Sequence, residues 1–289
     1  MDPLILHNGS LTPLAEARLS PGQAGLLAGW GVFTTLRIYR SQPFEFHRHW
    51  ERMRRDATRL GIEMIYSESA VASSIVELAR ANQRPEGMAR VWFVRNQGGL
   101  WADEAPRPAT DLLVFTRDLV PWPAEHRLLI VPHALYSAGV LAGAKMLSWA
   151  QNSLLAERAR RQGYDDALLL NERGELAECT SANVFLVIGG NVLTPPLASG
   201  CLAGVTRDVL FEIAPRAGIE LREQVLTPGD LSRAEEVFIS STTREVAGVG
   251  FVASAEGGEM KWRVSGRVTT ALGSMFQRYV DDKYREKNT

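Results

Sequence analysis

The chain has few cysteines, almost no net charge and no long apolar run. Cys179 and Cys201 are the only cysteines among its 289 residues, too few for a disulfide framework and not clustered as metal ligands, which fits a reducing compartment. Lysine and arginine number 32, and aspartate and glutamate 33. The formal net charge of −1 therefore gives no broad attraction to nucleic acid or to an anionic membrane. The N-terminal residues lack the pattern of a cleavable leader, and apolar runs stay shorter than a membrane span. We expect a soluble, cytoplasmic protein whose partner is a small molecule.

Strand-like and helix-like hydrophobic periods alternate along the chain, without a low-complexity tract or a fixed repeat. The pattern predicts strands at 32–39, 91–95, 112–116, 127–131, 167–170, 184–188 and 237–240, and helices at 47–60, 150–162 and 264–283. Pro121 and Pro123 favour extended backbone and mark a boundary. We expect an α/β (α+β) fold with a smaller N-terminal α/β domain over residues 1–120 and a larger C-terminal domain over residues 121–289.

One lysine and one glutamate suggest a chemistry. Lys145 opens the stretch Lys145–Trp149, and Glu178 opens the later stretch Glu178–Asn183. Pyridoxal 5'-phosphate (PLP) needs a lysine amine to hold its aldehyde as a Schiff base, and an acidic partner keeps its pyridine nitrogen protonated so that the ring accepts electrons. The ordinary alternative is a solvated lysine and a solvated glutamate. The pair therefore gains weight only if the chain also offers a site for a phosphate.

Two stretches offer groups that bind a phosphate dianion. In Leu202–Asp208, Gly204 permits a tight turn before a helix whose N-terminal amides would point outward. In Ser240–Thr243, hydroxyl and amide groups directly follow an apolar strand. Each stretch has the alternative of an ordinary helix cap or turn. An arginine usually completes such a site, and periodicity leaves open which arginine of the predicted helix 47–60 does so: Arg48, Arg52, Arg54 or Arg55.

Three other features have simpler interpretations. His47 and His49 are two residues apart, but helical residues at that spacing point in different directions and no nearby carboxylate completes a set, so we expect no metal. Gly29-Trp30-Gly31 looks like the start of a dinucleotide-binding loop, yet the third glycine is missing and a strand follows. Cys179 beside Glu178 is interpreted as a packed small side chain, not as a nucleophile.

A series of motifs over residues 8–250 carries a family resemblance through its order and spacing. The motifs are Asn8-Gly9, Gly29–Thr35, His49–Met53, the Lys145 stretch, Gly163–Leu170, Glu178–Phe185, Thr194–Pro196, Gly204–Arg207, and Glu236–Phe238 leading into Ser240–Thr243. Together they resemble class IV aminotransferases, which include branched-chain and D-amino acid aminotransferases and 4-amino-4-deoxychorismate lyase. The resemblance implies a two-domain fold type IV PLP enzyme with the cofactor in the interdomain cleft. It also implies a homodimer in which the early domain of one subunit helps to close its partner's site.

Residue by residue, the resemblance implies specific roles. Lys145 would be the Schiff-base lysine and general base, and Glu178 would bond the pyridine nitrogen. The residues implied to hold the phosphate are Arg52, Val205, Thr206, Ser241 and Thr242. A guanidinium fork suits a phosphate better than an ammonium group does. When substrate displaces Lys145 from the aldehyde, the freed amine is well placed to take the substrate's proton and return it elsewhere.

Within the family, Phe33-Thr34-Thr35 and the stretches at Lys145 and Glu178 look most like aminodeoxychorismate lyase, which expels pyruvate and forms 4-aminobenzoate for folate biosynthesis. This resemblance points to Thr34 or Thr35 near the reacting carbon. One alternative is a branched-chain or D-amino acid transaminase with 2-oxoglutarate as acceptor. Branched-chain enzymes carry glutamate in place of Thr34 and tyrosine in place of Ala150, whereas Ser241–Glu245 looks closer to D-amino acid aminotransferases.

The residues that recognise the substrate are less specific. The lyase pattern has an arginine and a tyrosine beyond the glycines that follow Arg95, and this chain has Leu100 and Trp101 there. Arg95 and Arg90 are the candidates for binding a carboxylate of an amino substrate, although strand arginines beside a loop are often solvated. A further alternative is a catalytically silent PLP-binding protein. The presence of both Lys145 and Glu178 argues against it.

Overall fold

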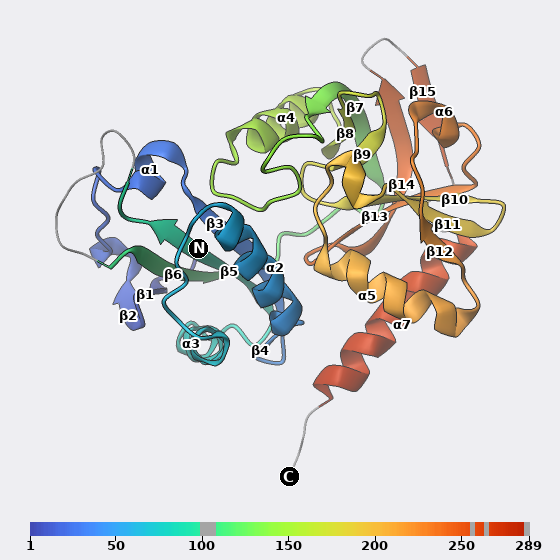
Figure 1. Ribbon diagram of the computed structural model, residues 1–289. Coiled ribbons are helices and arrows are strands. Elements are labelled where there is room, and N and C mark those ends of the chain that lie inside the picture. The colour runs from blue at the N-terminus through green and yellow to red at the C-terminus, as the bar shows by residue number, and fades with distance from the viewer. Residues whose placement is uncertain (99–107, 255–257, 263–265, 286–289) are drawn as a thin grey trace. The chain divides into compact units, whose positions relative to one another are not determined.

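The computed structural model describes residues 1–98, 108–254, 258–262 and 266–285. These residues fall into two compact units (Figure 1). The first contains Met1–Val120 together with Ala144–Trp149, and the second contains Pro121–Gly143 and Ala150–Arg285. Helices and strands occur in both, which confirms the expected α/β (α+β) class. The stretch around Lys145 thus groups with the N-terminal residues, although it follows the proline segment along the chain.

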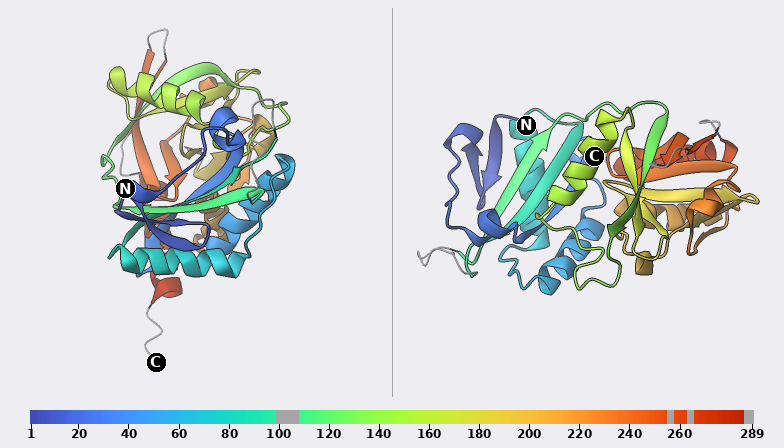
Figure 2. Two further views of the ribbon diagram at one scale, coloured as in Figure 1. Left: turned by 90° about the vertical axis from the view of Figure 1, so that its left-hand side faces the viewer. Right: turned by 90° about the horizontal axis from the view of Figure 1, so that it is seen from above.

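The first unit is an antiparallel sheet with its two longer helices on one face. Its strands are β1 (Leu4–His7), β2 (Ser10–Pro13), β3 (Gly31–Tyr39), β4 (Gln42–Pro43), β5 (Gly87–Arg95) and β6 (Thr110–Arg117). Its helices are α1 (Ala24–Ala28), α2 (Phe46–Arg59) and α3 (Glu68–Ala81), with a 3-10 turn η1 (Leu14–Glu16). Within the described residues the strand order is β2-β1-β6-β5-β3-β4. Helices α2 and α3 pack on the same side of the sheet, and α3 runs along it in Figure 2, left.

Alternation along β3 decides which side chains meet these helices. Val32, Leu36 and Ile38 are fully buried in the core that the sheet shares with α2 and α3. Phe33 and Thr35 point to the opposite face, because successive strand residues alternate between faces. The strand therefore offers one set of residues to the helical side and another to the far side of the sheet.

The second unit contains most of the strands. They are β7 (His126–Leu135), β8 (Asp166–Asn171), β9 (Leu176–Cys179), β10 (Asn183–Ile188), β11 (Asn191–Thr194), β12 (Leu221–Glu223), β13 (Glu236–Ser241), β14 (Glu245–Ser254) and β15 (Gly258–Lys261). Their order in the described residues is β12-β11-β10-β13-β14-β7-β8-β9, with β15 beside β14. Strand β9 also pairs with β10 through Glu178 and Asn183, so the path β10-β13-β14-β7-β8-β9 returns to its start. Such closure removes free strand edges, and here it occurs at Glu178.

The helices of the second unit are α4 (Ala150–Arg161), α5 (Val205–Ile213), α6 (Pro228–Leu231) and α7 (Arg267–Tyr284), with 3-10 turns η2 (Leu197–Ser199) and η3 (Ala214–Ala217). Helix α5 packs against α7 (Figure 1). Every strand and helix predicted from the sequence overlaps an observed one, although Val264, the expected first residue of the last helix, lies outside the described residues. No helix in the described ranges has both the length and the apolar character needed to cross a membrane.

Candidate active site

Lys145 is fixed at its backbone within the first unit. The Phe33 N–H donates to the Lys145 carbonyl oxygen (3.1 Å). The Lys145 N–H in turn donates to the carboxylate of Asp56 on α2 (3.1 Å), a fully buried side chain. The Lys145 ammonium group lies 4.7 Å from the ring centroid of Phe33 and 4.6 Å from that of Trp149. The amine is therefore held beside two aromatic rings on a backbone that is anchored to both β3 and α2.

Two glycines make room for this stretch. The Leu147 N–H donates to the Gly31 carbonyl oxygen (2.9 Å), so the chain runs directly alongside the start of β3. A Cβ on Gly31 would overlap the Leu147 side chain and lie 2.7 Å from the Phe93 carbonyl oxygen. Gly29 has φ +63°, and a Cβ there would lie 2.9 Å from Cα of Ser148. The two glycines that look like a dinucleotide loop thus allow the close approach of the Lys145 stretch.

Arg52 belongs to a buried polar cluster on the helical side of β3. Its Nη2 donates to Thr34 Oγ1 (2.9 Å) and lies 3.4 Å from Nδ1 of His49. Thr34 Oγ1 is 2.7 Å from the same Nδ1. Because a guanidinium group can only donate, Nδ1 is the acceptor in its contact with Arg52 and carries no proton. The Thr34 hydroxyl therefore donates to Nδ1, while the Thr34 oxygen accepts from Arg52. The cluster fixes the position of Arg52, and Thr34 connects Arg52 to His49.

Electrostatics agree with this direction of hydrogen bonding. Burial, followed by the positive charges of Arg52 and Lys145, holds the pKa of His49 well below its ordinary value. A neutral His49 with the proton on Nε2 is the acceptor that Thr34 requires. His49, Arg52 and Lys145 therefore share one electrostatic neighbourhood in the first unit.

Thr35 lies on the far side of β3 from this cluster. Arg90 Nε donates to Thr35 Oγ1 (3.0 Å), and the Arg90 guanidinium carbon lies 5.2 Å from the centroid of Phe33. Arg90 also lines a cavity of about 120 Å³ together with Met1, Met88, Trp92, Phe115, Thr116 and Arg117. Burial and the charge of Arg117 lower the pKa of Arg90, and no carboxylate among the described residues forms an ion pair with it. A bound anion would stabilise both arginines.

Arg95, the second candidate for a carboxylate, is engaged with the backbone. Its Nε donates to the Gln97 carbonyl oxygen (2.7 Å) and its Nη1 to the Gly61 carbonyl oxygen (3.1 Å). Its guanidinium carbon lies 4.1 Å from the centroid of Trp30. These contacts tie the residues after α2 to those after β5. Leu100 and Trp101, which replace residues of the lyase pattern, lie outside the described residues.

Glu178 lies on β9 of the second unit, at the point where the strands close. Its carboxylate accepts a hydrogen bond from the Leu202 N–H (3.0 Å). Its strand partner Asn183 donates from Nδ2 to the Leu202 carbonyl oxygen (2.9 Å). Asn183 thus shapes the surroundings of Glu178. The half-buried carboxylate is positioned by two elements of the same unit.

Next to Glu178 the chain enters α5 through a glycine. A Cβ on Gly204 would overlap the Asn183 side-chain oxygen, so a larger residue there would displace the Asn183 side chain. Val205 and Thr206 are the first residues of α5, whose N-terminal amides have no partner within the helix. Thr206 is 2 % exposed, and within the described part of the chain its hydroxyl has no hydrogen-bond partner. A buried hydroxyl beside free helix amides is the donor set that a phosphate requires.

The turn between β13 and β14 supplies further hydroxyls. Ser240 is buried, and its hydroxyl also has no partner among the described residues. Ser241 and Thr242 are half-buried, and Ser241 Oγ accepts from the Arg244 N–H (3.2 Å). The residues predicted to bind a phosphate from the second unit therefore occupy a helix start and a turn that both offer donors to an anion.

The two cysteines are not reactive thiols. Burial raises the pKa of Cys179 well above its ordinary value, and it raises the pKa of Cys201 to about 12 with a further contribution from Glu178. Both thiols thus stay protonated at neutral pH, which agrees with the interpretation of Cys179 as a packed side chain.

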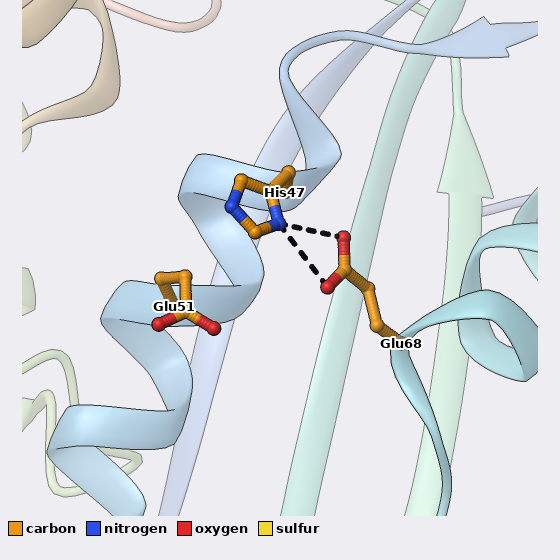
Figure 3. Close-up of side chains that lie close together, drawn as sticks. All are labelled: His47, Glu51 and Glu68. Carbon is orange, nitrogen blue, oxygen red and sulfur yellow. Dashed lines mark hydrogen bonds and ion pairs between the residues drawn. The ribbon is translucent and has the colours of Figure 1, made fainter.

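The expectation that no carboxylate lies near His47 is wrong. One helical turn places Glu51 on the same side of α2, and the start of α3 brings Glu68 to within 3.0 Å of His47 Nδ1 (Figure 3). Ligand-type atoms of the three residues lie within 4.8 Å of one another. The His47 side chain is 72 % exposed, so the group lies in solvent and away from the buried His49. None of the residues assigned to PLP belongs to it.

Two residues were missed as parts of the candidate site. His49 was considered only as a metal ligand, and Asp56 was not considered. With Arg52 they recur at a spacing of three and four residues, which places polar groups on one side of a helix. That spacing is a signal that the sequence contained.

Comparison with known proteins adds the family. The family profile described as Amino-transferase class IV matches residues 31–250. The chain belongs to this family. The resemblance of the motifs is thus confirmed, and with it the expectation of an enzyme whose family cofactor is PLP.

Class IV relatives with different activities resemble the chain to a similar degree. A Methanocaldococcus jannaschii protein with the provisional name branched-chain-amino-acid aminotransferase is 31% identical over 85% of this chain and 86% of its own length. The D-alanine aminotransferase of Bacillus licheniformis is 28% identical over 84% and 86%. The aminodeoxychorismate lyase of Bacillus subtilis is 27% identical over 98% and 97%. Identity alone therefore does not separate lyase from transaminase.

Solved class IV structures share the fold. The branched-chain aminotransferase of Thermoproteus uzoniensis, determined with norvaline, is 25% identical with a TM-score of 0.87 and covers 98% of this chain and 96% of its own. The branched-chain amino acid aminotransferase of Escherichia coli is 25% identical with a TM-score of 0.85 over 97% and 94%. The expected fold type is thereby confirmed.

Proposed function

We propose that the chain is a PLP enzyme in which the Lys145 group of the first unit and the Glu178 group of the second act on one cofactor molecule. The cofactor requires an amine for its aldehyde, an acidic group for its ring nitrogen and donors for its phosphate. Lys145 and Glu178 supply the first two. The observation that carries the proposal is the buried Thr206 hydroxyl, which has no partner in the described residues and lies at the start of α5.

The phosphate would be held by groups of complementary charge. Arg52 brings a guanidinium group fixed by Thr34 and His49. The amides of Val205 and Thr206 and the hydroxyls of Thr206, Ser241 and Thr242 complete the donor set. No metal is needed, because a helix N-terminus and an arginine together neutralise a dianion.

Lys145 is proposed to move the substrate proton. When bound, PLP withdraws electrons from the carbon that bears the substrate amine. The Lys145 amine, released from the aldehyde, accepts the proton of that carbon and delivers it to another atom. The Asp56 carboxylate and the Phe33 amide hold the backbone of Lys145 while its amine takes up and delivers the proton. The rings of Phe33 and Trp149 limit where the amine can point.

We propose aminodeoxychorismate lyase chemistry as the first candidate reaction. Lys145 would remove the proton from the ring carbon that bears the amine, the bond between the neighbouring ring carbon and the enolpyruvyl oxygen breaks, and enolpyruvate leaves with the bonding electrons. Return of the proton to the methylene carbon of enolpyruvate gives pyruvate, and the ring becomes 4-aminobenzoate. Supporting groups lie on one side of β3: the Thr35 hydroxyl, the Arg90 guanidinium beside it and the Phe33 ring near the Lys145 amine. Arg90 would bind a substrate carboxylate. Thr34, tied to Arg52 and His49, is better suited to positioning than to contact with the reacting carbon.

An amino acid transaminase is the second candidate. It is favoured by the transaminase names of relatives that cover most of the chain, and Arg90 would bind the carboxylate of an amino acid or of 2-oxoglutarate equally well. Thr34 and Ala150 depart from the branched-chain pattern, so D-amino acids belong beside branched-chain amino acids as substrates to test.

A substrate panel separates these reactions. The purified protein would be mixed with aminodeoxychorismate and, separately, with branched-chain L-amino acids or D-alanine plus 2-oxoglutarate. Release of 4-aminobenzoate and pyruvate supports the lyase, and formation of glutamate supports the transaminase. An inactive protein that still binds PLP would overturn both.

The covalent assignment has its own test. Borohydride reduction of the PLP-loaded protein, followed by digestion, should place a pyridoxyl mass on Lys145. Lys145→Ala should abolish the label and lower turnover by about 10²–10⁴-fold, as expected for a lost general base. The exposed Lys261→Ala is the matched control and should keep both label and turnover. A label on any other lysine contradicts the assignment.

We also propose finer assignments that follow from the family resemblance. They are a cytoplasmic homodimer, a domain boundary at Pro121 and, for the lyase, a place in folate biosynthesis. The boundary is supported by the change of compact unit at that residue. Light scattering at several protein concentrations tests the homodimer, since a mass of one chain at all of them would rule it out.

A further inference from the structure

A buried ion pair in the second unit lies behind the loops that carry Glu178 and Ser241. Asp166 is the first residue of β8 and Arg244 ends the turn after β13. Arg244 Nη2 and Asp166 Oδ2 are 3.0 Å apart, and both side chains are 2 % exposed. Neither residue was assigned a role from the sequence or from the comparisons.

Asp166 holds the loop that follows Glu178. Its Oδ1 accepts from the Thr180 N–H (3.2 Å) and from the Thr180 hydroxyl. Its Oδ2 accepts from the Ser181 hydroxyl (3.1 Å). The carboxylate fixes Thr180 closely, because this buried residue would otherwise lack a partner for its hydroxyl, while Ser181 adds a contact at the exposed side of the loop.

Arg244 connects that loop to the hydroxyl-rich turn. Its Nη1 donates to the Ser181 hydroxyl (3.0 Å) and to the Ser181 carbonyl oxygen (3.3 Å). Its backbone N–H donates to Ser241 Oγ (3.2 Å). The ring of Trp122 lies 3.8 Å from its guanidinium carbon and covers the group from one side. Arg244 thus contacts both loops, and Asp166 neutralises its charge.

Strand pairing holds the ends of both loops: Glu178 pairs with Leu169 of β8 and with Asn183 of β10, and Asn183 pairs with Ser240 of β13. The Asp166–Arg244 pair adds side-chain contacts between the loop at Ser181 and the turn at Ser241. The phosphate of PLP is joined to the pyridine ring by a short methylene–oxygen link, so the phosphate and the ring nitrogen stay within a limited range of separations. A protein that binds both ends would therefore need to hold the Glu178 loop and the Ser241 turn within that range.

We propose that the Asp166–Arg244 pair is the positioning element that sets this separation. The inference rests on the proposed assignment of Glu178, Ser241 and Thr242 to the cofactor. Asp166 and Arg244 are positioning residues, since they act through Thr180, Ser181 and Ser241. Loss of the pair should disturb both ends of the cofactor at once.

The test uses Arg244→Gln, Asp166→Asn and the double variant, each with bound PLP. Three quantities would be measured: the dissociation constant of PLP, the pH midpoint of its visible absorbance, and the 31P chemical shift of its phosphate. The pH midpoint reports on the Glu178 end and the 31P shift on the Ser241 end. Outer residues that orient ligand-binding groups change affinity by roughly 10–100-fold in metal sites, and we expect about tenfold weaker PLP binding here.

A matched control separates positioning from stability. Leu231 is fully buried in the core of the same unit, and Leu231→Ala should lower the unfolding temperature without moving the pH midpoint or the 31P shift. Arg244→Lys keeps the charge but not the fork, so it should fold and give smaller shifts than Arg244→Gln. The double variant should be no worse than either single variant, because the two residues act as one pair.

The outcomes distinguish this inference from the proposed function. If Arg244→Gln and Arg244→Lys lower the unfolding temperature but leave all three quantities at wild-type values, or move only one end, the pair is merely structural. Glu178→Gln should move the pH midpoint, and Ser241→Ala together with Thr242→Ala should move the 31P shift. If these variants have no effect, the cofactor assignment itself fails and the inference fails with it.

Discussion

At the scale of single residues, His47 and His49 lie two positions apart on α2 in opposite environments. His47 is exposed beside Glu51 and Glu68, whereas His49 is buried beside Arg52. Their sequence spacing predicted different directions, but it did not show which histidine would face the core. The same is true of Arg52, whose role came from the family resemblance and not from helical periodicity. Burial of a polar residue depends on its partners, and these come from distant parts of the chain.

His49 should make stability depend on pH. Its pKa is about 6.5 in the unfolded chain and well below that in the folded state, mainly because of burial. Between the two values the unfolded state binds more protons. Stability is thus complete above pH 6.5 and falls as the solution becomes more acidic, by up to about 1.4 kcal/mol per pH unit.

The free energy of unfolding can be measured with urea from neutral to acidic pH for the wild type, His49→Gln and His47→Gln. The difference in this free energy between the wild type and His49→Gln should shrink as the pH falls. His47→Gln, changed at an exposed residue, should show the same pH dependence as the wild type. Equal pH dependence in all three proteins would contradict a neutral, buried His49. Subtraction is needed because burial and then the charge of Arg244 also lower the pKa of His126.

Replacement of Arg90 should affect substrate binding, whereas replacement of Arg95 should affect stability. Arg90→Gln should raise KM for a carboxylate substrate about 10–100-fold, since a hydrogen bond to a charged group contributes roughly 1.5–3 kcal/mol. Arg95→Gln should leave KM near its wild-type value and lower the unfolding temperature, because its donors hold backbone carbonyls. Steady-state kinetics on the substrate found by the panel, with thermal unfolding beside it, gives both values. The reverse pattern would assign the carboxylate to Arg95.

At the scale of elements, periodicity predicted three helices and most of the central strands but omitted strand β14 and helix α3. Its buried residues Val71, Ile75, Leu78 and Ala79 do recur at helical spacing, and Ser67 caps its first turn by accepting from the Ala70 N–H (3.2 Å). The intervening serines and alanines weaken the contrast between the two sides of the helix. The signal was therefore present, and amphipathicity alone was too weak to reveal it.

The start of β3 should tolerate no side chain at Gly31. A methyl group there would overlap Leu147 and press on the Phe93 carbonyl oxygen, which cannot move without shifting β5. We expect Gly31→Ala to cost about 1–3 kcal/mol of stability and to slow pyridoxyl labelling of Lys145. Gly229→Ala on α6, where the new Cβ would lie 3.5 Å from Thr227 Oγ1, is the control. If Gly31→Ala is labelled at the wild-type rate, the Lys145 stretch does not pack closely against the start of β3.

At the scale of the whole molecule, the division of the residues into two compact units could not be derived from their order along the chain. Pro121 suggested one boundary, yet Ala144–Trp149 returns to the first unit through hydrogen bonds to β3 and α2. The closure of β9 on β10 at Glu178 likewise joins strands whose order along the sheet no local pattern encodes. The chemistry proposed for Lys145 and Glu178 depends on residue type. Their supporting contacts depend on topology.

If both groups serve the same cofactor molecule, PLP should protect both units from amide exchange. Hydrogen exchange followed by mass spectrometry should slow in peptides that cover Lys145–Trp149 and, together with them, in peptides from Glu178–Asn183 and Gly204–Thr206. Ligand at 100 times its dissociation constant stabilises a protein by about 2.7 kcal/mol, which is easily seen in exchange rates. In Lys145→Ala the phosphate and ring contacts remain, so protection should weaken everywhere but persist near Thr206. Protection confined to one unit at saturating PLP would mean that the two groups do not act on one cofactor molecule.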